Sequence, residues 1–223
     1  MEKKLITTSD GSHTLYQPGI DEHYHSTHGA LHESRHVFIG KGLNHLDKNI
    51  EPVNVLEVGF GTGLNALLTL IESEKDKRKI HYIGVEPYPL EEHFFKKLNY
   101  GKLIEYDKAG NYLQQMHEKD WNFPFYITEY FILNKLRTKF EEATLQPSMF
   151  HLIYYDAFAP DKQDELWNKK NFEKCYTALK EGGVLVTYSS KGQVKRDLAQ
   201  AGFNVSKVEG PEGKREMLRA IKR

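Results

Sequence analysis

The chain has 223 residues, of which 39% are hydrophobic and 28% charged, so it is long enough for one globular domain with a full core. Its 31 basic and 31 acidic residues give a formal net charge of zero, which excludes nucleic-acid binding through overall charge; any RNA contact needs a local basic patch. The one cysteine, Cys175, excludes an internal disulfide and a cysteine-based zinc site. No signal peptide or membrane-spanning apolar run of about 18 residues is evident, and we expect a cytoplasmic protein.

The first 50 residues predict an extension packed on a core of residues 51–223. Residues 4–9 and 12–16 flank Asp10-Gly11, a strong hairpin signal, and residues 27–41 have helical composition. Several histidines crowd this region, but zinc sites need tightly specified ligand sets, so we expect no metal; the histidines are His23, His25, His28, His32 and His36. The alternative is a polar cap segment whose Tyr24 and His25 line a site entrance.

The most informative stretch is VNVLEVGFGTGLNALLTL, residues 53–70. Its apolar start predicts a buried parallel strand, and Gly59, Gly61 and Gly63 then lead directly into a helix. Glycines let the backbone approach a ligand closely, and a helix N-terminus offers free N–H groups. The third glycine comes one residue early for a dinucleotide fingerprint, because Leu64 takes its place. This spacing favours a nucleoside ligand without a pyrophosphate, such as S-adenosylmethionine.

A second predicted strand, residues 79–85, ends at Glu86. An acid at this strand tip can accept hydrogen bonds from both ribose hydroxyls of a nucleoside. The alternative interpretation is a glycine-rich turn of another kind of α/β protein, with Glu86 merely solvated.

The rest of the chain alternates helical and extended segments. We expect helices at residues 89–99, 106–119, 164–179 and 191–201, with Gly182-Gly183 closing the third. Two strands or a hairpin are expected within 123–140, and strands at 150–156, 184–189, 203–208 and 216–221, the last two joined by a turn at 210–213. Together these elements predict an α/β, Rossmann-like methyltransferase fold with an N-terminal hairpin and helix extension.

Asp156 is the best catalytic candidate. It ends the strand of residues 150–156, and in an open parallel sheet ligands lie beyond the carboxyl ends of the strands. Methyl transfer from a sulfonium is an in-line displacement, so a carboxylate there can orient an acceptor amine, with Phe158 walling one side. An alkyl ammonium has a pKa near ~10.4 and no lone pair until it loses a proton, and a nearby carboxylate stabilises its charged form. We therefore expect Asp156 to position the amine, leaving water, Tyr24 or His25 as proton acceptor; alternatively, Asp156 only caps a turn.

These motifs together resemble the methyltransferase component of the bacterial tRNA wobble-uridine pathway, which converts 5-aminomethyl-2-thiouridine to its 5-methylaminomethyl form. The resemblance spans nearly the whole chain, and its most specific parts are the motifs GFGTGLN at residues 59–65 and DAFAP at 156–160. Supporting matches are DGSHTL at 10–15, YHS at 24–26, ESRHVF at 33–38, Trp167 and KREML at 214–218.

The resemblance implies roles for specific residues. S-adenosylmethionine would contact Glu57, Gly59, Gly61, Gly63, Asn65 and Glu86. Asp156 would face the aminomethyl group. With the candidates from the residues themselves, we expect Asp156 and Tyr24 to be catalytic and His25, Phe158 and Pro160 to contact the substrate. Relatives carry an acid after the third core strand for the adenine amino group; residues 132–135 offer Asn134 instead.

The resemblance also implies partners. Many relatives are fused to a flavin-dependent oxidase that prepares the amine; this chain ends at Arg223, so we expect another enzyme to supply the aminomethyl uridine. The tRNA anticodon stem-loop would need a basic surface, for which Lys191, Lys214 and Arg215 are candidates together with Lys195, Arg196, Arg219, Lys222 and Arg223. We expect a monomer. The rival functions are a small-molecule amine methyltransferase, an aminopropyltransferase like spermidine synthase, and a catalytically silent cofactor-binding module.

Overall fold

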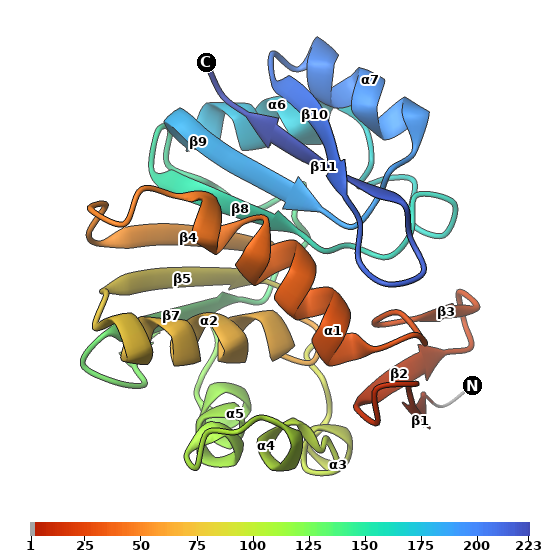
Figure 1. The fold of residues 1–223 in the computed structure, drawn as a ribbon, viewed down its shortest axis with the longest axis vertical. Coiled ribbons are helices and arrows are strands. Elements are labelled where there is room, and N and C mark those ends of the chain that lie inside the picture. Colours follow the sequence, from red (N-terminus) through yellow and green to blue (C-terminus); the bar gives the residue numbers. More distant parts are fainter. Residues whose placement is uncertain (1–2) are drawn as a thin grey trace.

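The computed structural model describes residues 3–223, which form one eight-stranded sheet covered by helices and one smaller sheet (Figure 1). The strand order of the large sheet is β10-β11-β9-β8-β4-β5-β7-β6. Its centre is parallel, whereas β6, β7 and β9, β10, β11 pair antiparallel at the two edges. The strands are β4 (Val53–Val58), β5 (Ile80–Val85), β6 (Pro124–Tyr126), β7 (Phe131–Leu136), β8 (Phe150–Tyr155), β9 (Leu179–Thr187), β10 (Asn204–Glu209) and β11 (Glu216–Ile221). This confirms the predicted Rossmann-like fold.

Helices cover both faces of this sheet (Figure 1). One face carries α1 (Ala30–Ser34), its π-helical continuation Arg35–Gly40, α2 (Leu64–Asp76) and α5 (Ala109–Glu118). The other carries α6 (Lys169–Ala178) and α7 (Gly192–Gln200). Three short helical segments complete the set: Leu43–His45, α3 (Glu92–Phe95) and α4 (Tyr100–Leu103).

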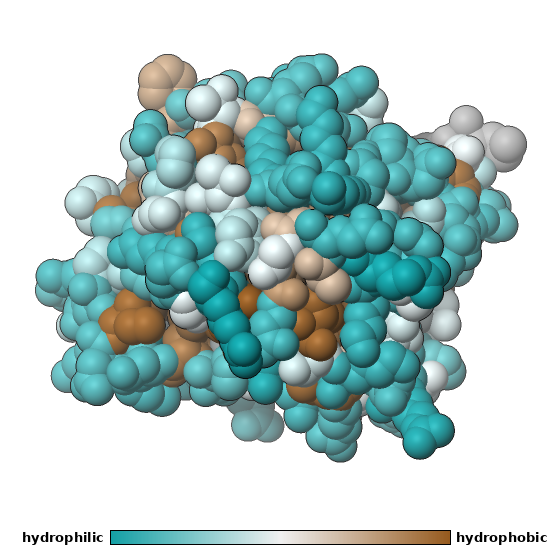
Figure 2. Space-filling view, turned by 90° about the horizontal axis from the view of Figure 1, so that it is seen from above, coloured by the Kyte–Doolittle hydropathy of each residue, from teal (hydrophilic) through white to brown (hydrophobic). Residues whose placement is uncertain are grey.

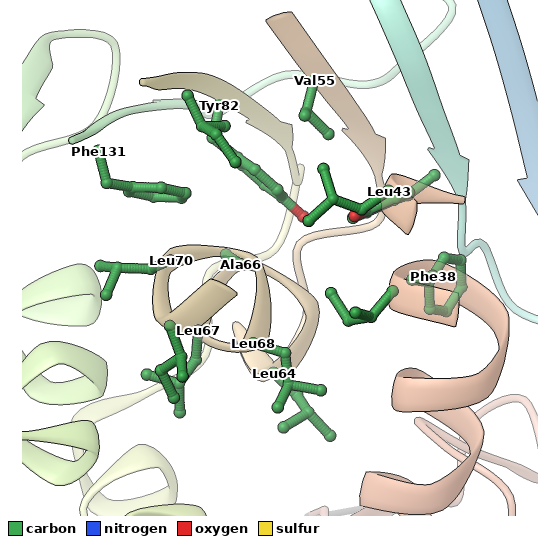
Figure 3. Packing of buried hydrophobic residues seen from close by; sticks show 14 of the residues in the cluster. Phe38, Leu43, Val55, Leu64, Ala66, Leu67, Leu68, Leu70, Tyr82 and Phe131 are labelled. Atoms are coloured by element: carbon green, nitrogen blue, oxygen red, sulfur yellow. The ribbon is translucent and has the colours of Figure 1, made fainter. Parts of the chain in front are cut away.

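The sheet separates two hydrophobic clusters, and β4 contributes to both. Alternate side chains of a strand point to opposite faces, so Val55 packs under α2 whereas Leu56 and Val58 pack under α6 and α7. Figure 3 shows part of the first cluster: α2 lies between the sheet residues Tyr82 and Phe131 and the helix that carries Phe38, and its Leu64, Leu67 and Leu68 side chains point away from the sheet. The position of the loop between β4 and α2 is thus fixed by the core on both sides.

The N-terminal region forms the predicted hairpin as a small sheet of β1 (Lys4–Thr7), β2 (His13–Gln17) and β3 (Glu22–His23). The connection is longer than the expected two-residue turn, because pairing stops at Thr7 and His13. The Asp10 carboxylate accepts hydrogen bonds within this connection and from the N–H of His32, which ties the hairpin to α1. The division at residue 50 stays a prediction.

Two expected elements differ from the structure. Gly182-Gly183 does not close a helix: α6 ends at Ala178, and β9 runs through both glycines, with the N–H of Gly182 bonded to the carbonyl of Lys222. The helix itself starts at Lys169 rather than near 164, because the Asn168 side chain caps it by accepting from the N–H of Asn171. The helix expected at 89–99 shrinks to α3. The helix predicted at 106–119 and the 123–140 hairpin are confirmed.

Among residues 3–223, no helix has the length and apolar character needed to cross a membrane. The face seen from above is mostly hydrophilic, with small scattered hydrophobic patches (Figure 2).

Candidate active site

A cavity of about 510 Å³ opens at the carboxyl ends of β4, β5 and β8, within the range of small-ligand sites. Most of its lining comes from the segment after β3, the loop after β4, the tip of β5 and the loop after β8, and α1, the loop after β7, Tyr188 and Lys214 contribute the rest. The predicted site residues in its lining are Tyr24, His25, Gly59, Gly61, Asn65, Glu86, Asp156, Phe158 and Lys214. Glu57, Gly63, Pro160, Lys191 and Arg215 lie outside the lining.

The glycine loop has the close contacts that its sequence predicts. Gly59 has a φ of +91°, and a Cβ built there would lie 2.5 Å from the carbonyl oxygen of Asp156. Gly61 has a φ of +50°, and its Cβ would lie 3.2 Å from the Tyr24 ring. At Gly59 both the backbone conformation and the lack of space exclude a side chain, whereas at Gly61 the positive φ disfavours one and the Tyr24 ring would have to shift slightly. Gly63 has the different role of N-cap of α2, with a φ of +73°.

Thr62, at the centre of this loop, is held by residues that the sequence did not single out. The His117 Nε2 lies 2.9 Å from the carbonyl oxygen of Thr62, and its ring stacks on Phe95 at 4.6 Å. The Thr62 hydroxyl accepts a bond from the Tyr100 hydroxyl at 3.3 Å. Since α4 and α5 supply Tyr100 and His117, two distant elements fix the loop before any ligand binds.

Glu86 is preorganised as an acceptor at the tip of β5. The N–H groups of Gly61 and Tyr88 donate to its two carboxylate oxygens at 3.1 and 2.9 Å. Burial raises the pKa of Glu86, and these two bonds oppose the rise. The carboxylate therefore lies beside the glycine loop in the position expected for a ribose-binding acid.

Glu57 lies beneath the cavity in a buried network. The Asn65 Nδ2 donates both to Glu57 Oε1 at 2.9 Å and to Asp156 Oδ2 at 2.7 Å. Burial, followed by the charge of Asp156, raises the pKa of Glu57 well above its ordinary value. Asn65 thus connects the first turn of α2 to the end of β8, and Glu57 fixes the orientation of its amide.

Asp156 faces the cavity from the end of β8 and is half-buried. Burial, and then the charge of Glu33, raise its pKa to about 8, against the lowering effects of the Asn65 bond and of Lys214. A carboxylate with this pKa is a much better proton acceptor than an ordinary aspartate.

The two acceptors left open by the sequence are less suitable. His25 is held between the hydroxyls of Thr14 and Thr62, at 3.2 and 3.4 Å, and burial lowers its pKa to about 4. Burial and the charge of Glu86 raise the pKa of Tyr24, which keeps its phenol protonated at neutral pH. Tyr24 instead packs edge-on against Phe158 at 5.1 Å, so the two rings form one wall of the cavity.

Because the pKa of Asp156 is raised, we expect the difference in stability between the wild type and an Asp156→Asn variant to depend on pH. The folded protein binds this proton more tightly than a free aspartate with a pKa of 3.8, so ionisation between about pH 4 and pH 8 costs folding stability. We expect Asp156→Asn, which keeps an acceptor for Asn65, to match the wild-type melting temperature near pH 4 and to exceed it increasingly up to about pH 8. Thermal melts across this range test it, and a difference that stays constant with pH would contradict it.

The cavity lining contains an ion pair between Lys214 and Glu33 that the sequence did not predict. Lys214, from the loop between β10 and β11, donates to Glu33 of α1 at 2.8 Å. Its Nζ also lies 4.4 Å from the ring centre of Tyr188, whose hydroxyl donates to the carbonyl of Ala157. Glu33, Tyr188 and Lys214 all line the cavity. Lys214 and Glu33 are 181 positions apart, so no sequence spacing could reveal the pair.

Two of the predicted basic residues do not lie free on the surface. Lys214 points into the cavity, and the buried Lys222 donates to the carbonyl of Leu179. Lys191 is paired with Asp161, and Arg215 is exposed outside the cavity.

An acidic residue beyond the stretch considered in the sequence lies in the cavity lining. Asn134 is within β7 and outside the cavity lining, whereas Glu141 lines the cavity from the loop that follows this strand. Residues 132–135 lie within β7, which extends to Leu136, so the loop after this strand begins later than the sequence interpretation placed it.

Within residues 3–223, no group of three or more His, Cys, Asp or Glu side chains is arranged to hold a metal ion. His36, one of the crowded histidines, instead bonds the carbonyl of Glu209.

Comparisons with known proteins agree with this geometry. Residues 111–223 match the model of a family described as S-adenosyl-L-methionine-dependent methyltransferase. The chain is 30% identical over 225 residues to the tRNA 5-methylaminomethyl-2-thiouridine biosynthesis bifunctional protein MnmC of Cupriavidus metallidurans, covering 95% of this chain and 33% of that protein. The MnmC of Burkholderia mallei is 31% identical, with 96% and 34% covered. The chain thus spans about a third of the length of these relatives.

Two solved structures share the fold. The crystal structure of MNMC2 from Aquifex aeolicus has a TM-score of 0.82 and 26% identity, covering all of this chain and 70% of that one. Spermidine synthase from Thermotoga maritima has a TM-score of 0.54 and 14% identity, covering all of this chain and 72% of that one, which is a likeness of fold alone.

Proposed function

This chain belongs to the S-adenosyl-L-methionine-dependent methyltransferases, and from that premise we propose that it N-methylates the 5-aminomethyl group of uridine or 2-thiouridine at the tRNA wobble position. The product would be the 5-methylaminomethyl nucleoside. The similarity to MnmC proteins and to MNMC2 supports this substrate. The observation that carries the proposal is the placement of Asp156 in one cavity with Glu86 and the glycine loop.

The residues present fit the cofactor. Glu86 offers a preorganised carboxylate for the ribose, and the absence of a Cβ at Gly59 and Gly61 lets the loop pass close to the Asp156 backbone and the Tyr24 ring. Glu141, after β7, is the candidate acceptor for the adenine amino group. When bound, S-adenosylmethionine supplies an electrophilic methyl group on a sulfonium. Glu57, Gly63 and Asn65 would support the loop from below and at the start of α2.

Asp156 would both orient the amine and take its proton. The substrate arrives as an alkyl ammonium with a pKa near ~10.4, and it needs a free lone pair to attack. One ammonium proton passes to an Asp156 oxygen, which leaves a neutral amine hydrogen-bonded beside the carboxyl group. Tyr24 and Phe158 exclude water from one side, so the amine keeps a single orientation. Asp156 then returns the proton to solvent.

Capture of the wobble base would use the open side of the cavity. Single-stranded bases can be splayed into protein pockets, and exposed cations hold the flanking phosphates. Arg215 and Lys191 are the candidates for phosphate contacts, and Pro160 and His25 for framing the entrance. The protein would act in the cytoplasm as a monomer. Another enzyme would make the aminomethyl uridine that it methylates.

Transfer of radiolabelled methyl from S-adenosylmethionine to bulk tRNA tests this function. We expect tRNA from cells lacking the gene to accept label, and nucleoside mass analysis to find it as 5-methylaminomethyl uridine or its 2-thio form. Absence of label in tRNA, with cofactor binding confirmed by calorimetry, would contradict the proposal and favour a small-molecule amine as acceptor.

A further inference from the structure

Lys214 lines the active-site cavity, as Lys139 also does, and its ammonium contacts two other residues of the lining, Glu33 and Tyr188. It donates to Glu33 Oε1 at 2.8 Å and lies 4.4 Å from the centre of the Tyr188 ring, a cation–π contact. The other Glu33 oxygen accepts from the N–H of Ser26 at 2.9 Å. A carboxylate and an aromatic face therefore enclose one alkyl ammonium on two sides.

Glu33 and Tyr188 are held in place by the fold, whereas the Lys214 side chain is more exposed and less constrained. The Glu33 side chain is 9% exposed and is held by α1, and Tyr188 is anchored through its hydroxyl to Ala157. The Lys214 side chain is 35% exposed and comes from the turn between β10 and β11. The carboxylate and the ring would stay in place if the lysine moved toward solvent.

We infer that Glu33 and Tyr188 form a primary-ammonium subsite, which Lys214 occupies in this structure and which the aminomethyl group of the substrate takes over on entry. This inference rests on the proposed function, because it assigns the incoming cation to that substrate. A lysine side chain and a 5-aminomethyl group both end in a CH₂–NH₃⁺ group, so they satisfy the same acceptors. The subsite lies in the same cavity as Asp156, to which the amine can then pass its proton.

Occupation by Lys214 carries a cost for substrate binding. The substrate ammonium must displace a bound cation, which lowers its apparent affinity by the fraction of molecules in which the subsite is free. Without the lysine, the desolvated Glu33 carboxylate has no cationic partner and favours the substrate more strongly. A lysine that contacted RNA phosphates would have the opposite effect, because its removal would weaken binding of every RNA.

Lys214→Met is the decisive variant, since it keeps the apolar stem over Tyr188 and removes the charge. We would measure the Kd of two anticodon stem-loops, one with 5-aminomethyl uridine and one with unmodified uridine at the wobble position, with S-adenosylhomocysteine present. The ratio of the two Kd values should shift by about threefold or more in favour of the aminomethyl RNA, the size expected of a partly exposed ion pair. Lys207→Met, at an ion-paired lysine of the same hairpin outside the cavity, is the matched control and should leave the ratio unchanged.

Other outcomes separate failure of this inference from failure of the function. Equal weakening of both RNAs by Lys214→Met, or an unchanged ratio, would overturn the subsite. Glu33→Gln should abolish the preference for the aminomethyl RNA while the Kd for S-adenosylhomocysteine stays within about twofold; a retained preference would also overturn it. If the wild-type protein shows neither preference nor methyl transfer, the proposed function itself fails.

Discussion

Asp156→Ala is expected to lower the turnover number for aminomethyl tRNA by at least about 100-fold while the Kd for S-adenosylmethionine changes by less than several-fold. The side chain faces the cavity from the end of β8, and its pKa of about 8 makes the ionised carboxylate a stronger base than that of an ordinary aspartate. Its removal takes away both the orientation of the amine and the destination of its proton. Single-turnover rates with preformed complex, and calorimetry with the cofactor, measure the two quantities separately.

Asp161→Ala is the matched control, because Asp161 follows Asp156 in the same loop but pairs with Lys191 outside the cavity. Its turnover should remain within about twofold of the wild-type value. If Asp156→Ala weakened cofactor binding as much as it slowed turnover, Asp156 would belong to the cofactor site. The pH profile adds a second check: activity should rise with pH through about 8 as Asp156 ionises, since only the ionised form can accept the proton.

The central βαβ unit could be predicted because its signals are local. The run of residues 53–58 has apolar residues on both faces, the glycines follow at once, and Glu86 comes directly after the next strand. Each of these features depends on near neighbours, so pattern and backbone agree. The glycines carried the strongest signal because Gly59 and Gly61 have both positive φ and close neighbours.

The missed parts of the site depend on contacts between distant segments. Glu33 and Lys214 meet only because the turn before β11 packs against the segment before α1, where a Cβ on Gly213 would lie 2.8 Å from the His28 ring. The contact between His117 of α5 and the carbonyl of Thr62 likewise joins segments that are far apart in the sequence. The sequence also does not reveal which C-terminal lysines are exposed: Lys222 is buried and donates to a carbonyl of β9. No sequence period encodes such contacts.

Gly59→Ala is expected to weaken binding of S-adenosylmethionine by at least about 100-fold. Both φ at +91° and the 2.5 Å approach to the Asp156 carbonyl oppose a side chain, and the opposing atom is backbone, which cannot rotate away. The loop must shift from β8, and with it the N–H of Gly61 that holds Glu86. Calorimetry with the cofactor measures the loss, and circular dichroism confirms that the variant is folded.

Gly182→Ala separates backbone strain from the clash. Gly182 also has a φ of +73°, but a Cβ there would meet nothing within 4 Å, and it lies in β9 away from the cavity. This variant should lose about 1 kcal/mol of stability, the usual cost of a non-glycine residue at positive φ, with cofactor affinity unchanged. Equal cofactor affinity in Gly59→Ala and Gly182→Ala would mean that the loop after β4 tolerates a displaced backbone. The close contact between β4 and β8 would then have no part in cofactor binding, and Glu86 would have to hold the ribose without the N–H of Gly61.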